Sequence, residues 1–317
     1  MTGEAIDKKQ IKQRDRMEFR KKLKNQRSLI FLSIPFVVFV IIFNYIPLVG
    51  WLMAFQNYKP RLGLFGSEFV GLKQFEKLFS NEIFLGVIRN TLAMGVINLV
   101  LQTFFAILFA ILLNEVRQRH VKKVIQTISY MPHFLSMIIV TGIVFDVLSL
   151  DGIINEILTG IGIVGKPVMF LAEPNFFWWI VGFTNVWKET GWNSIIYLAA
   201  ITSINTDLYE AASIDGAGRI GKIWHVTLPG LRPTIMILLI INIGNVLNAG
   251  FELQYILGNG LVQSVSQTID IYVLKYGIGQ NNFSIGTAAG IFKSLVSIIL
   301  IVVANQVAKK MGEERLF

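Results

Sequence analysis

Residues 209–233, YEAASIDGAGRIGKIWHVTLPGLRP, form a polar segment between two strongly apolar blocks. Such a segment in a membrane protein has to lie in water or against another protein. Asp207 and Glu210 stand three positions apart, as a helix N-cap and its returning carboxylate do. Gly216 and Gly218 allow the backbone to turn sharply, including through positive φ. The pattern predicts a helix, a glycine turn, an amphipathic helix and then a new apolar helix, in whose first turn Pro229 is well placed.

The composition is that of a polytopic membrane protein. The chain has 317 residues, of which 53% are hydrophobic and 15% are charged. It has no cysteine, which excludes disulfides, thiolate nucleophiles and cysteine metal sites. Its three histidines, His120, His133 and His225, do not stand at the close spacing of a local metal motif, so no metal site is expected.

Six apolar stretches are long enough to cross a bilayer, which requires about 20 residues. They cover approximately residues 28–55, 84–113, 124–148, 176–201, 231–251 and 284–308. The predicted fold class is therefore an all-α, polytopic membrane protein with six transmembrane helices. Residues 28–308 form one transmembrane domain with a polar loop at about 205–230, and residues 1–27 and 309–317 are its two tails.

The distribution of positive charge predicts the orientation. With the N-terminus inside, the inner segments carry twenty of the 29 lysines and arginines, and the outer segments carry six. Because cytoplasmic loops are enriched in Lys and Arg, both termini and the polar loop are expected in the cytoplasm. The basic residues nearest the first span are also expected to touch anionic membrane lipid.

Polar and aromatic side chains inside the fourth and fifth spans are candidates for a solute pathway, because such groups are costly at membrane depth unless they face protein or water. Carboxamides offer paired donors and acceptors to sugar hydroxyls, and flat aromatic rings cover the apolar faces of sugars. Asn242, Asn245 and Asn248, spaced by three, predict a stripe on one helical face. The candidate pathway residues are Asn185, Trp187, Glu189, Trp192, Asn193, Asn245, Asn248, Phe251 and Glu252.

Each of these residue types also has a structural role. Asparagines form hydrogen bonds between membrane helices, and tryptophans mark the membrane interface. Lys188 and Glu189 can neutralise each other or a neighbour. Asn90, Asn98 and Gln102 in the second span are weaker candidates for the pathway, and hydrogen bonding between helices is their expected role.

The polar loop carries a family resemblance. Glu210-Ala211-Ala212, Gly216, Val226 and Leu228-Pro229 resemble the EAA loop of the membrane subunits of ABC importers, with Val226 where the family usually has Ile. The continuation Ile214-Asp215-Gly216-Ala217 is similar to the carbohydrate-uptake branch. Segments along nearly the whole chain resemble the maltose-permease-like subunits, in particular the subgroup related to LplB and YteP: Tyr45-Ile46-Pro47, Ala54-Phe55-Gln56-Asn57-Tyr58, Val70-Gly71-Leu72 and Asn90-Thr91.

The resemblance implies the type I importer (MetI-like) fold and a set of partners. These are a homologous second permease, two ATPase subunits that bind ATP and Mg²⁺, an extracytoplasmic solute-binding lipoprotein and a saccharide. No counterpart of the large periplasmic domain of maltose permease is present, so maltose is not carried over as the substrate. The resemblance places a coupling helix against the ATPase, with these residues at or beside the contact: Glu210, Ala211, Ala212, Asp215, Gly216, Arg219 and Pro229.

Two other function classes fit the sequence less well. The chain has no G-x-x-x-x-G-K-[ST] motif, the P-loop that binds ATP. If ATP drives transport, another subunit therefore hydrolyses it, and this chain is not expected to be an enzyme. An ion-coupled secondary transporter needs titratable groups along its path, and Asp146, Lys188, Glu189 and Glu252 are a sparse set. A membrane enzyme would need paired catalytic groups within the spans. No feature indicates nucleic acid as a partner.

Overall fold

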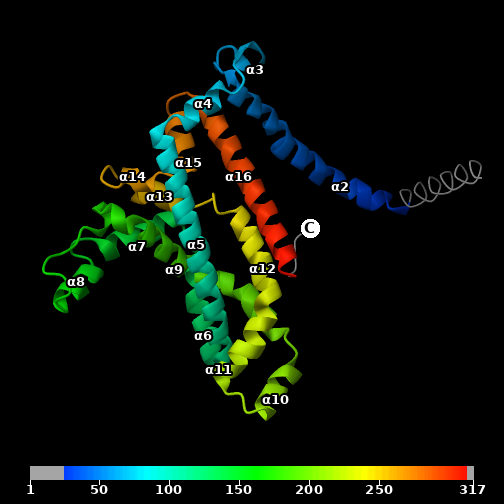
Figure 1. The fold of residues 1–317 in the computed structure, drawn as a ribbon, viewed down its shortest axis with the longest axis vertical. Helices are drawn as coiled ribbons and strands as arrows, with labels where there is room; N and C mark the ends of the chain where they lie inside the picture. The colour runs from blue at the N-terminus through cyan, green and yellow to red at the C-terminus, as the bar shows by residue number, and fades with distance from the viewer. Residues whose placement is uncertain (1–24, 313–317) are drawn as a thin grey trace, which may run out of the picture.

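The structure, a computed structural model, describes residues 25–312, so that most of the predicted N-terminal tail and the last five residues of the C-terminal tail lie outside the described residues. The long helix α5 (Glu82–Glu115) extends along much of the molecule. The short helix α3 (Gly63–Gly66) lies at one end of the molecule, and α10 (Thr206–Ile214) and α11 (Arg219–Lys222) lie at the other (Figure 1).

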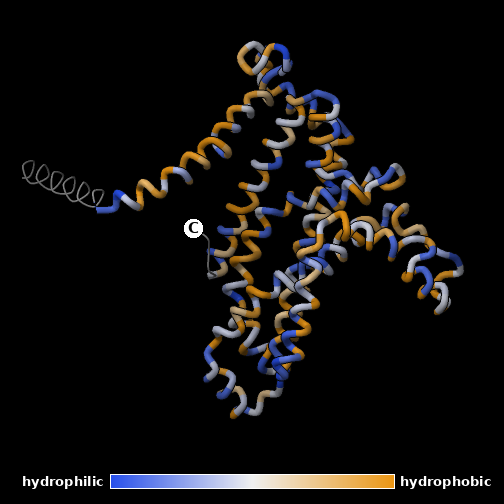
Figure 2. The backbone as a smooth tube through the Cα atoms, turned by 180° about the vertical axis from the view of Figure 1, so that it is seen from behind, coloured by the Kyte–Doolittle hydropathy of each residue, from blue (hydrophilic) through white to orange (hydrophobic). Residues whose placement is uncertain are grey.

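The first span leans away from the other helices (Figure 1). It consists of α2 (Arg27–Val40), a π-helical turn η1 (Ile41–Tyr45) and a 3₁₀ segment η2 (Ile46–Phe55). Pro47 stands in the first turn of η2, and its missing N–H accounts for the change in helix geometry there. The helix α2 has no buried residue and is apolar along its length (Figure 2). Lipid or another protein therefore has to cover it.

A small hairpin and a short helix connect the first span to α5. Strands β1 (Gln56–Asn57) and β2 (Glu68–Phe69) pair antiparallel, with Gln56 opposite Phe69, and α4 (Lys73–Phe79) follows. The carbonyl of Gln56 accepts hydrogen bonds from Gln74 Nε2 at 3.0 Å and from Ser284 Oγ at 2.7 Å. These bonds join the hairpin to the start of the last helix.

The helix bundle is built around α5. Helix α5 packs along α9 (Pro174–Thr202). Helix α12 (Leu228–Gly244) packs against α16 (Phe283–Lys310). Residues of α5 belong to all three buried apolar clusters along the molecule, among them Phe84, Met94 and Ala106. Between α12 and α16 the chain forms α13 (Glu252–Leu257), α14 (Gln263–Ser266), α15 (Ile269–Tyr272) and the π-helical η6 (Val273–Ile278).

The predicted single helix over residues 124–148 is wrong. The structure divides this part of the chain into α6 (Arg119–Tyr130), a 3₁₀ turn η3 (Met131–Phe134) and α7 (Met137–Leu148). Pro132 cannot donate a helical hydrogen bond, and the Ser136 hydroxyl accepts one from the Ile139 N–H at 3.4 Å to begin α7. After α7 come α8 (Ile153–Gly160) and the 3₁₀ turn η4 (Phe170–Ala172).

Five helical stretches of residues 25–312 are long and apolar enough to cross a membrane: Arg27–Phe55, Glu82–Glu115, Met137–Gly160, Arg219–Gly244 and Phe283–Lys310. The predicted fourth span corresponds to α9, which has 29 residues and is also long enough. Its polar side chains, among them Lys188, Glu189 and Asn193, lower its hydropathy. The polar helix α9 is therefore where the structure departs from a simple apolar bundle.

Candidate functional site: an exposed loop and a carboxamide-lined cavity

The polar loop begins with α10, whose N-terminus is capped by Asn205. Its side-chain Oδ1 accepts a hydrogen bond from the backbone N–H of Asp207 at 3.0 Å. The prediction that Asp207 is the N-cap is therefore wrong. Asp207 lies in the first turn, where its negative charge is favourable at the positive end of the helix. Both Asn and Asp cap helices well, so residue type alone did not distinguish them.

Gly216 ends α10 with a left-handed turn. Its φ is +79°, as predicted, and the bonds of a Schellman motif surround it. The N–H of Gly216 donates to the Ser213 carbonyl at 3.1 Å, and the N–H of Ala217 donates to the Ala212 carbonyl at 2.8 Å. Gly218 has extended backbone with φ −72°, so the positive φ that was allowed for both glycines occurs only at Gly216.

The loop presents polar and apolar side chains together at its surface. Glu210, Ala211, Asp215 and Arg219 are exposed, and Ala212 is half-buried. Among the large apolar residues, Ile214 is 87% exposed and Ile220 is 72% exposed. The surface of the loop is therefore partly apolar.

The loop is joined closely to the span that follows it. Arg219–Gly244 is one continuous helix that includes the π-helical turn η5 (Ile223–Thr227), and Pro229 lies immediately after that turn. The hydroxyls of Tyr209 and Thr227 are 3.0 Å apart, and Lys222 Nζ donates to Ser213 Oγ at 2.6 Å. These two bonds hold α10 against the base of the helix.

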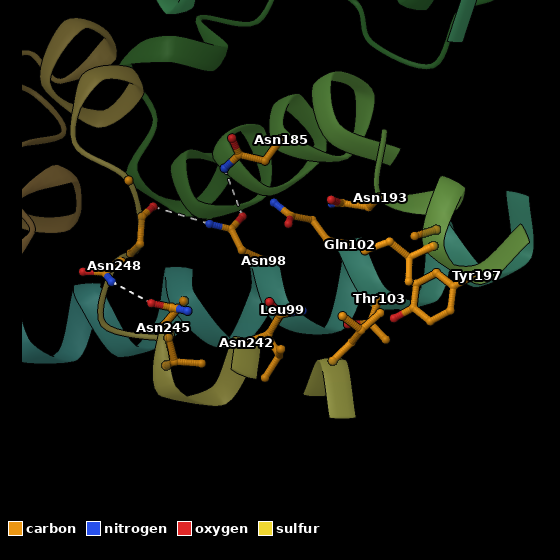
Figure 3. Close-up of a pocket in the computed structure, with 17 residues that line it drawn as sticks. Asn98, Leu99, Gln102, Thr103, Asn185, Asn193, Tyr197, Asn242, Asn245 and Asn248 are labelled. Atoms are coloured by element: carbon orange, nitrogen blue, oxygen red, sulfur yellow. Dashed lines mark hydrogen bonds between the residues drawn. The ribbon is translucent and has the colours of Figure 1, made fainter. Parts of the chain in front are cut away.

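A polar cavity of about 390 Å³ lies among α5, α9 and the end of α12 (Figure 3). Carboxamide side chains from all three regions line it: Asn98, Gln102, Asn185, Asn193, Asn242, Asn245 and Asn248. Thr103 and Tyr197 add hydroxyl groups, and no Asp, Glu, Lys or Arg is among the described residues that line it. The cavity can therefore donate and accept many hydrogen bonds without presenting a net charge.

The predicted helical stripe of asparagines is wrong in its geometry. The helix α12 ends at Gly244, with Asn245 as its C-cap, and Asn248 lies in the following turn with its N–H donating to the Asn245 carbonyl at 2.8 Å. Asn242, Asn245 and Asn248 nevertheless line the same cavity, because the turn brings them to one side.

Four of these asparagines are partly occupied by bonds within the protein. Asn185 Nδ2 donates to Asn98 Oδ1 at 3.2 Å, and Asn248 Nδ2 donates to Asn245 Oδ1 at 3.1 Å (Figure 3). Asn98 Nδ2 in turn donates to the Ala249 carbonyl at 3.4 Å. These bonds hold the cavity wall together and fix the directions of the amides that remain available.

Three other carboxamides make no side-chain hydrogen bond within residues 25–312: Gln102, Asn193 and Asn242. Their donors and acceptors are available to a solute. Sequence reasoning had assigned Gln102 to helix–helix bonding and had not selected Thr103 or Tyr197. Only the α5–α9 packing brings these residues to the cavity, and no local pattern indicated it.

Glu189 and Trp192 lie outside this cavity, in contact with the turn η3. Glu189 Oε2 is 2.7 Å from His133 Nδ1, and the ring of Trp192 stacks on the ring of His133 at 4.5 Å. Lys188 Nζ lies 3.2 Å from Glu189 Oε1 and donates to the His133 carbonyl at 2.7 Å. Lys188 and Glu189 thus form an ion pair, as in the alternative that they neutralise each other, and His133 contacts both of them.

Three more candidate pathway residues also lie away from the cavity wall. Trp187 lines a separate apolar groove among α7, α8 and α9. Phe251 stacks on Tyr255 with the ring centroids 5.2 Å apart, and Glu252 is the first residue of α13. Both follow Gly250, which lines the cavity. Of the nine candidate pathway residues, the cavity brings together Asn185, Asn193, Asn245 and Asn248.

No metal site is formed by the part of the chain that the structure describes, since nowhere do three His, Asp or Glu side chains come together.

The chain matches a family model and close relatives over most of its length. Residues 102–313 match the model of the binding-protein-dependent transport system inner membrane component. The polygalacturonan/rhamnogalacturonan transport system permease protein YteP of Bacillus subtilis is 42% identical over 99% of this chain and 97% of its own length. The protein LplB of the same organism is 43% identical over 93% of this chain and 92% of its own length.

Solved structures agree with these relatives. A chain of a bacterial ABC transporter involved in the import of the acidic polysaccharide alginate superimposes with a TM-score of 0.84. It is 37% identical and is matched over 92% of this chain and 99% of its own length. A second structure, of the alginate transporter with a periplasmic protein that holds an alginate pentasaccharide, has a TM-score of 0.85 and 36% identity. The predicted type I importer fold is confirmed, and the chain belongs to the family of binding-protein-dependent transport system inner membrane components.

Proposed function

We propose that this chain forms half of the membrane path through which an ATP-driven importer passes an oligosaccharide or polysaccharide fragment to the cytoplasm. The single observation that carries the proposal is the uncharged carboxamide cavity between α5, α9 and α12. Sugar hydroxyls both donate and accept hydrogen bonds, and a carboxamide offers both functions. A wall without fixed charges holds such a solute without binding it too tightly to release.

The proposed cargo class follows from relatives as well as from the cavity. YteP is named for polygalacturonan and rhamnogalacturonan, and the superimposable chain belongs to an importer of alginate, an acidic polysaccharide. A fragment of an acidic or neutral polysaccharide is therefore the proposed cargo. It would be delivered by an extracytoplasmic solute-binding lipoprotein, as the alginate complex includes a periplasmic protein with its saccharide.

The proposed partners cover surfaces that the chain leaves exposed. A homologous second permease, together with membrane lipid, would cover the apolar helix α2, which has no buried residue. One of the two ATPase subunits would dock on α10 and the turn after it, at Glu210, Ala211, Ala212, Asp215, Gly216 and Arg219. ATP and Mg²⁺ are assigned to those subunits, so this chain acts as a transport subunit without enzymatic activity of its own.

The proposed location is the bacterial plasma membrane with both termini in the cytoplasm. The basic residues that predict this orientation include Lys309 and Lys310 in the last turn of α16. In this orientation α10 faces the ATPases. Closure of the ATPases would move α10 as a rigid body, and its bonds to the base of α12 would carry the movement to the cavity wall.

The decisive experiment is ATP hydrolysis by the purified complex in lipid nanodiscs. We expect a saccharide-loaded binding protein to stimulate hydrolysis well above the rate with the empty binding protein. Uptake in proteoliposomes should require ATP inside the compartment that the ATPases face. Uptake that is driven by a proton gradient without ATP would overturn the proposal in favour of a secondary transporter.

A further inference from the structure

The segment that follows α12 encloses a second polar cavity. It has a volume of about 160 Å³ and lies among α13, α14 and the α15–η6 helix. This volume is below the range of pockets that hold a whole drug-sized molecule. It can therefore take one unit of a longer chain, or a few waters.

Buried amide atoms without partners lie at this cavity. Gln267 is 3% exposed, and neither its Oε1 nor its Nε2 has a hydrogen-bond partner among residues 25–312. Gln254 is 1% exposed; its Nε2 donates to the Ala249 carbonyl, but its Oε1 has no partner in the described chain. Buried polar groups are almost always paired, so these three atoms indicate a partner from outside the protein.

A positive charge faces the same cavity. Lys275 lines it, is exposed, and forms no ion pair with any residue in the described range. No described Asp or Glu is among the lining residues. In this respect the smaller cavity differs from the carboxamide cavity, which presents no fixed charge.

The side chain of Gln254 lies between the two cavities. It lines the smaller one, and its amide contacts Ala249 and Gly250, which both line the larger one. A Cβ atom added at Gly250 would lie 2.8 Å from Gln254 Oε1, so the two walls touch.

We propose that the smaller cavity is a subsite for a single hexuronate unit of the cargo, and this inference rests on the proposed saccharide transport. The hydroxyls of the unit donate to Gln254 Oε1 and Gln267 Oε1 and accept from Gln267 Nε2, while its carboxylate faces Lys275. A neutral sugar would offer no carboxylate to the ammonium group of Lys275. An inorganic anion such as sulfate lacks the hydroxyl donors that the two glutamine oxygens require. This chain would thus recognise a carboxylate of the cargo at Lys275, and only hydroxyls of the cargo in the larger cavity.

The test compares a charged probe with its neutral methyl ester. Tritiated trigalacturonate and its methyl ester are titrated against the purified permease–ATPase complex in nanodiscs, without binding protein. We expect Lys275→Gln to weaken binding of the acid about three- to tenfold and to leave the ester unchanged, as for the loss of one partly solvated charge contact. Lys275→Arg should retain most of the affinity for the acid. Lys166→Gln, which removes an exposed lysine that does not line either cavity, should change nothing.

Three results would overturn the inference. The cavity holds only water if the wild-type complex binds neither probe, or if Gln267→Leu binds both as well as the wild type. Lys275 does not recognise the acid if Lys275→Gln weakens both probes equally. Uptake assays distinguish these failures from failure of the transport function. If Asn193→Leu abolishes ATP-driven uptake while Lys275→Gln has no effect, the transport proposal stands and the hexuronate subsite is wrong.

Discussion

The hydroxyl groups of Tyr209 in α10 and Thr227 in η5 lie 3.0 Å apart and join two segments that the glycine turn separates. Thr227 is buried. The helix continues from it through α12 to Asn242, which lines the cavity. Under the proposed function, a displacement of α10 by an ATPase would reach the cavity wall through this contact.

Loss of the Tyr209 hydroxyl is expected to loosen this connection. Tyr209→Phe removes one hydrogen bond, which contributes about 0.5–1.5 kcal/mol. We expect the complex to assemble but to import less saccharide per ATP hydrolysed, as measured in proteoliposomes. Thr227→Val should have the same effect, and the double variant should be no worse than either single one. Additive losses would mean that the two hydroxyls act independently.

Gly216 and Gly218 form a matched pair for testing the turn. Gly216→Val places a β-branched residue at φ +79°, at a cost of about 1–3 kcal/mol, although a Cβ there meets nothing within 4 Å. We expect normal membrane insertion but no uptake and little stimulated hydrolysis. Gly218→Thr introduces a side chain of nearly the same shape at φ −72° as a favourable N-cap, and it should transport normally. Normal uptake by Gly216→Val would show that the loop does not transmit movement.

The cavity asparagines are expected to separate into two groups. Asn193→Leu and Gln102→Leu remove amides that have no side-chain hydrogen bond within residues 25–312, so uptake should fall without a change in melting temperature. Each lost sugar contact of about 0.5–1.5 kcal/mol corresponds to about a two- to tenfold increase in the half-saturating concentration. Asn98→Leu should lower both uptake and melting temperature, because it breaks bonds to Asn185 and Ala249.

Asn175→Leu serves as the control for this prediction, because Asn175 lies outside the cavity and bonds only to Glu173. If Asn193→Leu and Gln102→Leu import saccharide as well as this control does, the carboxamide cavity is not part of the pathway.

Glu189 is expected to act on stability. Glu189→Gln leaves the ammonium of Lys188, whose side chain is 9% exposed, without its carboxylate and weakens the bond to His133. We expect a loss of about 1.5–3 kcal/mol in the free energy of unfolding, read as a lower melting temperature, with normal uptake per folded molecule. Glu156→Gln, at an exposed position, is the control. Reduced uptake at an unchanged melting temperature would instead place Glu189 in the solute pathway.

Cysteine labelling tests the orientation, since the chain has no cysteine of its own. Gly218→Cys and Gly260→Cys both have room for a side chain, because a Cβ at either glycine meets nothing within 4 Å. In intact cells a membrane-impermeant maleimide should label the cysteine at position 260 but not the one at position 218. After permeabilisation it should label both. The reverse pattern would place the α10 loop outside and contradict the proposed orientation.

Properties that depend on a short stretch of chain were predictable from the sequence. The apolar spans other than residues 124–148, the α10 helix and the positive φ at Gly216 follow from hydropathy, periodicity and the freedom of glycine, all of which act locally. The motif from Glu210 to Pro229 also indicated the family. Local ambiguity limited the detail, because Asn205 and Asp207 cap equally well and the spacing of Asn242, Asn245 and Asn248 fits a helix that in fact ends at Gly244.

Only the tertiary structure decided which polar side chains share a cavity. Glu189 is paired with His133, 56 residues earlier in the chain, while Asn193, one turn further along α9, lines the cavity with Gln102 of α5. The close approach at Gly95, where an added Cβ would lie 2.0 Å from the Val246 carbonyl, brings the turn after α12 against α5. Hydropathy gives the same cost to every buried amide, but whether that amide faces a partner or a solute depends on how distant helices pack.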